Sequence, residues 1–206
     1  ILKNYILGIS CFYHDSAVSL VEDGKITFAA QEERFTRKKQ DKSFPFRSIL
    51  SCLEGKNLKI NDIDFIVFYE KPSLKLDRIF KTYLDFTPNG LKSFNESFPT
   101  YIKNSLFKKR NITSELKKLG LTINEVNKKL FFSEHHLSHA ASAFYPSPFD
   151  KSAVLTMDGV GEWTTTSIAY GEENKIQILK EISFPNSLGL LYSSFTYYAG
   201  FKVLSG

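Results

Sequence analysis

The sequence predicts an α/β fold in which one structural unit occurs twice. Residues 5–30 have the pattern of a strand, a polar loop, a second strand, a tight turn and a third strand. Residues 152–183 repeat this order, although few residue identities coincide, and helix signals follow each copy. Between the copies, residues from about 72 to 128 have the composition of several helices. We therefore expect a duplicated α/β fold that carries a helical insert.

The first copy begins with an apolar run, residues 5–10, that is typical of a buried strand. Residues 12–16 are polar and should form a loop, and the apolar residues 17–21 resume as a strand. The Asp-Gly pair within residues 22–25 favours a hairpin turn. Residues 26–30 should therefore return antiparallel to the strand before them.

A segment dense in both signs of charge, residues 31–39, follows the first copy. Such a run is usually a solvated helix start with internal ion pairs. Pro45 then favours the start of an amphipathic helix that includes residues 48–53. Residues 64–69 form the next apolar, strand-like run.

The insert alternates lysine with leucine, phenylalanine and isoleucine, which suits helices that pack on one face only. Breaks between its helices are expected near residues 88–90, at Pro99 and near Gly120. The chain should then regain a strand at residues 129–132, directly before a cluster of histidines.

The second copy follows the histidines. Residues 152–157 and 163–170 should be strands separated by a glycine-rich loop, and residues 171–175 should turn into a third strand, residues 176–183. Residues 187–199 should close the chain as an aromatic-rich helix, because glycine follows directly.

Three of the four histidines lie within five positions of one expected helix. Ser133 is a suitable N-cap and Pro146 should stop the helix. Residues four apart share a helix face, so His135 and His139 can aim their imidazoles at one point, and His136 with His139 is the poorer pairing. Two neutral imidazoles on adjacent turns are half of a metal site. The alternative is that these rings cap backbone carbonyls or lie on a wet surface.

A carboxylate and two glycines follow the strand at residues 152–157. Asp158 ends that strand, where open α/β sheets place their ligands, and can be a third metal ligand or the acid of a phosphate loop. Gly159 and Gly161 would let backbone amides approach a phosphate. Alternatively, they serve a tight turn that needs positive φ.

Composition narrows the class of protein. The chain has 206 residues, of which 42% are hydrophobic, enough for a substantial core. The net charge of +5 comes largely from scattered lysines, which disfavours a nucleic-acid-binding role. Cys11 and Cys52 form no paired motif, so a reducing, cytoplasmic setting is expected. The sequence has no apolar run of membrane-spanning length, which predicts that no membrane is involved. Both ends of the sequence look truncated, and we expect the chain to be part of a longer protein.

The duplicated arrangement resembles the ribonuclease H-like superfamily of actin, sugar kinases and heat-shock ATPases, whose paired loops clasp nucleotide phosphates. Four sequence blocks are more particular. They are Gly8 followed by His14-Asp15, then residues 32–38, 134–144 and 157–162. In this order they resemble the amino-terminal part of the nodulation and antibiotic O-carbamoyltransferases, a domain similar to the tRNA threonylcarbamoyl transferases. The resemblance spans nearly the whole chain and is weakest in the insert.

The resemblance implies a reaction. In that family a YrdC-like domain makes carbamoyl adenylate from ATP and carbamoyl phosphate, and the amino-terminal domain transfers the carbamoyl group to a hydroxyl of a small metabolite. It implies a divalent metal, iron in that family, held by His135, His139 and Asp158, and the ligand types leave zinc open as the alternative. A further aspartate is expected beyond Gly206. The YrdC-like domain is absent here, so the chain alone should be inactive.

Two further residues have expected roles in that reaction. His14 lies in the loop after the first strand and can take the proton of the acceptor hydroxyl, since imidazole titrates near neutral pH. Arg37 is a candidate contact to nucleotide phosphate. Trp163 can stack on adenine, but a core position is the simpler interpretation. Whether the protein forms a homodimer stays open.

Three other functions compete. A tRNA threonylcarbamoyladenosine-type transferase is the nearest. A non-catalytic nucleotide-binding module of the actin-like kind would bind ATP without metal at the histidines. A sugar kinase would leave the pair of His135 and His139 without a role.

Overall fold

The computed structural model describes residues 3–203, except for the side chains of residues 97, 100, 101 and 103–106 within one helix. The chain forms two compact units, each described here by itself. The first unit comprises Ile1–Tyr69 and Thr100–Phe132, and the second comprises Glu70–Pro99 and Ser133–Gly206. The expected insert is thus divided, because its first helix belongs to the second unit and its last helix to the first.

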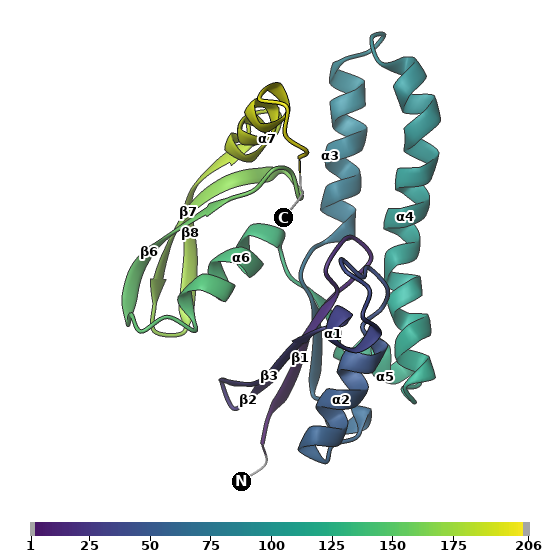
Figure 1. Ribbon diagram of the computed structural model, residues 1–206, viewed down its shortest axis with the longest axis vertical. Helices are drawn as coiled ribbons and strands as arrows, with labels where there is room; N and C mark the ends of the chain where they lie inside the picture. Colours follow the sequence, from purple (N-terminus) through teal and green to yellow (C-terminus); the bar gives the residue numbers. More distant parts are fainter. Residues whose placement is uncertain (1–2, 204–206) are drawn as a thin grey trace. The chain divides into compact units, whose positions relative to one another are not determined.

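The first unit contains a five-stranded sheet with the order β3-β2-β1-β4-β5 (Figure 1). Its strands are β1 (Tyr5–Ser10), β2 (Ala17–Glu22), β3 (Lys25–Gln31), β4 (Phe65–Phe68) and β5 (Leu130–Phe132). The first three strands form the predicted antiparallel meander, and β4 and β5 add in parallel. The hairpin turn is of the predicted kind, since Asp23 and Gly24 have φ values of 48° and 81°.

Apolar side chains at every second position of the strands point inward and build the core of the first unit. Leu7 and Ile9 of β1, and Val18 and Leu20 of β2, are almost completely buried. Helix α2 (Phe46–Lys56) packs against β2 and β3 through its buried face, as the amphipathic pattern predicted. Helix α5 (Ile123–Lys129) begins with a capping box between Thr122 and Glu125.

One charged residue of the segment 31–39 is buried. Glu32 is 2% exposed and precedes the short helix α1 (Glu33–Thr36). Its carboxylate accepts hydrogen bonds from the main-chain N–H groups of Arg47 and Ser48 and from the Ser48 hydroxyl. Glu32 therefore caps the start of α2 from a distant point of the chain, so this residue is not part of the expected solvated face.

The loop that follows β1 is fastened to residues 41 and 42. The N–H groups of Phe12 and Ser16 donate to the carbonyls of Lys42 and Asp41, each at 2.8 Å. The Asp41 carboxylate accepts from the hydroxyl and N–H of Ser43 and from the Thr36 hydroxyl, and these bonds lower its pKa below the ordinary value of 3.8.

This lowered pKa predicts a pH-dependent contribution to stability. A carboxylate with a lowered folded-state pKa stabilises the fold above its unfolded pKa, and that stabilisation disappears as the pH falls through the folded value. Asp41→Asn should therefore cost about 1 kcal/mol at pH 7, and the deficit should shrink below about pH 4. Urea unfolding from pH 7 to pH 3 measures it. A deficit that stays constant with pH would contradict the assignment.

The second unit contains the second predicted meander, β6 (Lys151–Met157), β7 (Thr164–Glu172) and β8 (Lys175–Ser183), which pair in sequence order. Helix α6 (His135–Phe144) crosses one face of this sheet (Figure 1). The duplicated arrangement predicted from the sequence is therefore present. The turn between β7 and β8 is tighter than expected, because only residues 173 and 174 lie between the strands.

Helix α7 (Leu188–Tyr198) closes the second unit as predicted. Ser187 is its N-cap, with a hydroxyl that accepts from the Leu190 N–H, and Gly200 follows the helix with φ of 84°. Gly189 lies against the loop after β6, because a Cβ there would be 2.6 Å from the Gly159 nitrogen. The start of α7 is thus in direct contact with that loop.

The prediction of a helix break at Pro99 is wrong. Helix α3 (Pro72–Asp85) ends as expected before the turn at residues 88–90, but α4 (Leu91–Lys118) continues through Pro99. Proline removes a single intrahelical hydrogen bond, that to the carbonyl of residue 95, and the long helix on either side maintains the geometry. Within the second unit, Phe94 and Phe98 of α4 pack against Tyr83 and Phe80 of α3.

Two general expectations can be compared with the structure. Cys11 and Cys52 are both buried, and burial raises the pKa of Cys52 to about 11, which makes its thiol unreactive near neutral pH. Among residues 3–203, the helices are either too short or too polar to cross a bilayer.

Candidate metal centre

Helix α6 presents its histidines in two directions. The helix begins at His135, with Glu134 in extended conformation as N-cap, so the prediction that Ser133 is the N-cap is wrong by one residue. The Glu134 side chain makes no capping hydrogen bond in the described structure, and the Glu134 carbonyl accepts from the N–H and hydroxyl of Ser138. One turn apart, the Nε2 atoms of His135 and His139 lie 3.2 Å from each other.

His136 points the other way, into the sheet. It is 4% exposed, and its Nδ1 lies 2.6 Å from the Thr156 hydroxyl, which is in turn 2.6 Å from the Ser167 hydroxyl. Burial lowers the pKa of His136, so its imidazole stays neutral near pH 7. The structure therefore forms the pair His135–His139 and leaves His136 as an anchor of α6 on β6 and β7.

Asp158 completes the group at the end of β6. Its Oδ2 lies 2.8 Å from Nε2 of His135, and its Oδ1 accepts from the Gly159 N–H. The hydrogen bond with His135 is the main reason that the pKa of Asp158 falls to about 2, against the opposing effect of burial. One ligand atom from each of His135, His139 and Asp158 lies within 4.8 Å of the other two.

The arrangement of donors suits a cation. Nε2 of His135 faces both a carboxylate oxygen and a second imidazole nitrogen, yet it can carry only one proton. A divalent cation among the three atoms would accept a lone pair from each. Metal–nitrogen bonds of about 2.1 Å at angles of 90–110° place two nitrogens about 3.0–3.4 Å apart, which is the separation found between His135 and His139. Partial burial and the neighbouring His135 lower the pKa of His139, which favours the neutral form that binds metals.

The loop after β6 holds His135 closely. A Cβ on Gly161 would lie 2.8 Å from Nε2 and 2.9 Å from Cγ of the His135 ring, so the space is available only to glycine. Neither Gly159 nor Gly161 has a positive φ, so the alternative of a tight turn that needs one is wrong. The structure places the His135 ring against Gly161, and the predicted approach of the Gly159 and Gly161 amides to a phosphate stays a prediction.

Glu162 was not predicted to have a role. It is 5% exposed and accepts from the main-chain N–H of Lys71, at 2.5 Å, and of His135, at 3.3 Å. Burial raises its pKa. The next residue, Trp163, is half-buried rather than a fully buried core residue, and it donates its indole N–H to Asp77 of α3. The only sequence signal for Glu162 was its place in the block 157–162.

The remaining predicted residues belong to the first unit. His14 is exposed in the loop after β1, with its Nδ1 2.9 Å from the Asp15 carboxylate. Arg37 is exposed at the end of α1 and has a positive φ of 59°. Their roles as base and phosphate contact stay predictions.

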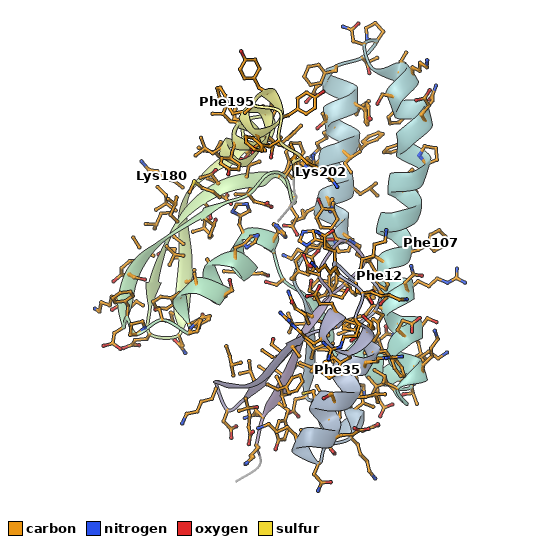
Figure 2. All side chains as sticks on the ribbon, in the orientation of Figure 1. Phe12, Phe35, Phe107, Lys180, Phe195 and Lys202 are labelled. Carbon is orange, nitrogen blue, oxygen red and sulfur yellow. The ribbon has the colours of Figure 1, made fainter. Side chains whose placement is uncertain are left out.

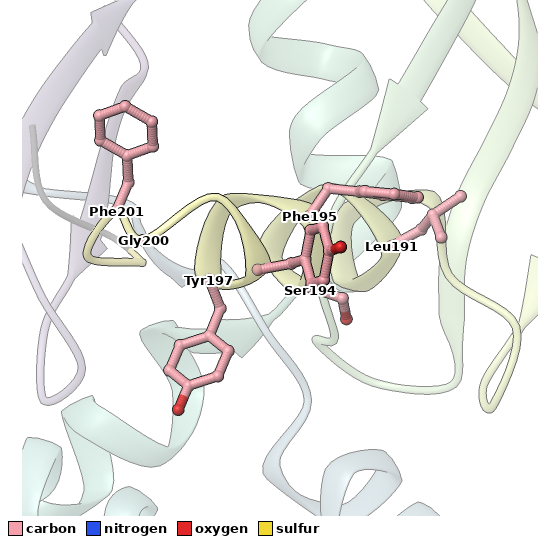
Figure 3. A pocket seen from close by; sticks show the side chains of 7 residues that line it. Leu191, Ser194, Phe195, Tyr197, Gly200 and Phe201 are labelled. Atoms are coloured by element: carbon pink, nitrogen blue, oxygen red, sulfur yellow. The ribbon is translucent and has the colours of Figure 1, made fainter.

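A hollow of about 870 Å³ lies along α7 and shares no residue with the group His135, His139 and Asp158 (Figure 3). It is mostly apolar, and Phe195, which is 64% exposed, projects from the helix beside it (Figure 2). Its lining residues are Leu191, Ser194, Phe195, Tyr197, Tyr198, Gly200 and Phe201.

One family description covers nearly the whole chain. The family description "Carbamoyltransferase N-terminus" matches residues 5–206. The uncharacterized protein sll1178 of Synechocystis is 54% identical over 202 residues, which are 98% of this chain and 33% of that protein. Nodulation protein NolNO of Sinorhizobium fredii is 33% identical over 193 residues, which are 92% of this chain and 26% of that protein. The chain thus spans about a third or less of the length of these two relatives.

A solved structure is more distantly similar. The Aquifex aeolicus member of the Ppx/GppA family has a TM-score of 0.36 and 13% identity, over 95% of this chain and 55% of that one.

Proposed function

Because the chain belongs to the carbamoyltransferase family, through the amino-terminal domain of these enzymes, we propose that it transfers a carbamoyl group to a hydroxyl of a small metabolite. The observation that carries this proposal is the convergence of His135, His139 and Asp158 in the second unit. These residues come from a helix and a strand end, and the donors that they supply are those used by catalytic metal sites.

The donor in this proposal is carbamoyl adenylate, made from ATP and carbamoyl phosphate. The acceptor oxygen attacks the carbamoyl carbon, a new C–O bond forms, and the bond to the phosphate of AMP breaks. AMP leaves with its electron pair, and the proton of the acceptor hydroxyl passes to a base, for which His14 is the candidate. Gly159, Gly161 and Arg37 are the candidates for contacts to the phosphate.

His135, His139 and Asp158 would hold a divalent cation, either iron or zinc, since both accept imidazole and carboxylate ligands. A bound divalent cation acts as a Lewis acid that polarises a carbonyl or phosphoryl oxygen. The low pKa of Asp158 and the lowered pKa of His139 support the proposal, because both groups are then deprotonated and available near pH 7.

The decisive experiment combines metal analysis with a transfer assay on the intact protein. We expect about one divalent ion per chain after reconstitution. We also expect AMP release and a labelled product when ATP, isotopically labelled carbamoyl phosphate and a hydroxylated metabolite are supplied together. Label in tRNA adenosine instead would favour the tRNA-modifying relative. ATP binding without metal or transfer would favour a non-catalytic nucleotide-binding module.

A further inference from the structure

Glu162 is a buried carboxylate that does not belong to the group of three ligands. Its two oxygens accept one hydrogen bond each, Oε1 from the main-chain N–H of Lys71 and Oε2 from that of His135. Lys71 is the N-cap of α3 and His135 is the first residue of α6. The carboxylate therefore satisfies a main-chain donor at the start of each of two helices, where negative charge is favourable.

His135 is held at three points by one short loop. Its ring nitrogen Nε2 meets the Asp158 carboxylate, its ring lies against the backbone of Gly161, and its main-chain nitrogen donates to Glu162. The first two contacts fix the ring, and the third fixes the backbone from which the ring projects. Moving the start of α6 would carry the His135 ring away from Asp158.

The hydrogen bond to Lys71 gives Glu162 a second fixed point. The Lys71 side chain also forms an ion pair with Glu134, at 2.7 Å, directly before His135. In the same unit, Trp163 donates to Asp77, six residues after Lys71 along α3. Glu162 thus lies between α3 and α6, with its carboxylate oriented by both, and it has little freedom to adjust if either partner shifts.

We propose that Glu162 is a positioning residue that sets the direction of the His135 imidazole toward a bound divalent cation. This inference rests on the metal site proposed above. It differs from a purely structural role, in which Glu162 would stabilise the start of α6 without affecting how tightly or in what geometry a cation is held. Residues that orient metal ligands typically contribute about 10–100-fold in metal affinity.

Two substitutions at position 162 test the proposal. Glu162→Gln keeps the shape but turns an amide NH₂ toward a main-chain N–H, so one of the two hydrogen bonds is replaced by a donor facing a donor. Glu162→Asp keeps the charge but is one methylene shorter and cannot reach both N–H groups. Glu134→Gln is the matched control, because it removes a carboxylate next to His135 that is 53% exposed and forms an ion pair with the Lys71 ammonium.

Co²⁺ alone is the probe, with affinity measured by titration and coordination read from the visible absorption spectrum of the bound ion. We expect Glu162→Gln and Glu162→Asp to bind Co²⁺ about 10–100-fold more weakly, with shifted absorption bands. Glu134→Gln should match the wild type in both. Thermal unfolding without metal accompanies each measurement, so that titrations are made where every variant is folded.

The outcomes separate the two proposals. If the wild type binds no Co²⁺, or His139→Ala binds it equally well, the proposed metal site is wrong. If the wild type binds Co²⁺ at that site but both variants at position 162 keep its affinity and spectrum, Glu162 has only a structural role. This second result would overturn the inference even if the variants unfold at a lower temperature.

Discussion

Replacing His139 with alanine is expected to abolish metal binding and carbamoyl transfer while leaving the fold intact. His139 supplies one of three converging donors, and its Nε2 is 3.2 Å from that of His135. Removing one of three protein ligands should weaken binding by about 1,000-fold or more, given that whole sites contribute on the order of 10 kcal/mol. Transfer should fall to background, measured as AMP release and labelled product.

The loss should not come from unfolding. His139 is the most exposed of the three candidate ligands although its ring is partly desolvated, and alanine has the highest helix propensity, so the free energy of unfolding without metal should stay within about 0.5 kcal/mol of the wild type. Ser142→Ala is the matched control on the same helix, because its hydroxyl donates to the main-chain carbonyl of His139 and is not one of the candidate ligands. Full metal content and full transfer in His139→Ala would show that the site is misassigned.

Gly161→Ala adds a single methyl group, but it should weaken metal binding almost as strongly as His139→Ala. The added Cβ would lie 2.8 Å from Nε2 of His135, well inside van der Waals contact. Because Asp158 lies at the same nitrogen, the ring has to rotate or α6 has to move, and both change the ligand geometry. We expect a loss of metal affinity of about 100-fold, measured by Co²⁺ titration.

Gly159→Ala provides the comparison for metal affinity within the same loop. A Cβ at Gly159 would meet only a Leu190 methyl group at 3.9 Å, an ordinary contact, and its φ is not in the left-handed region. It should therefore keep the Co²⁺ affinity of the wild type. Equal affinities in the two variants would mean that the His135 ring is free to shift, and the close-approach argument would fail.

The features predicted correctly are those that local periodicity encodes. The spacing of four between His135 and His139 places them on one helix face, and an apolar strand that ends at Asp158 brings a carboxylate to a sheet edge. The two antiparallel meanders were likewise predicted from local signals, namely apolar strand patterns and the turn residues between them. Each of these signals lies within a few residues of the feature that it predicts.

The features missed depend on partners distant in sequence. Glu32 reads as one of several surface charges, but it caps a helix that begins 14 residues later. Glu162 accepts from the N–H of His135 at the start of α6, which is 27 residues away in the sequence. It also accepts from the N–H of Lys71, which is 91 residues away. The continuity of α4 through Pro99 is likewise set by the surrounding helix, because proline by itself predicts a break. Buried carboxylates and tolerated prolines are tertiary effects that a local pattern does not contain.

All three candidate ligands lie between positions 135 and 158 of the chain, on one helix and the strand that follows it. Closing so short a segment costs little loop entropy compared with uniting ligands from distant domains. The relative placement of these three ligands therefore depends on the second unit alone.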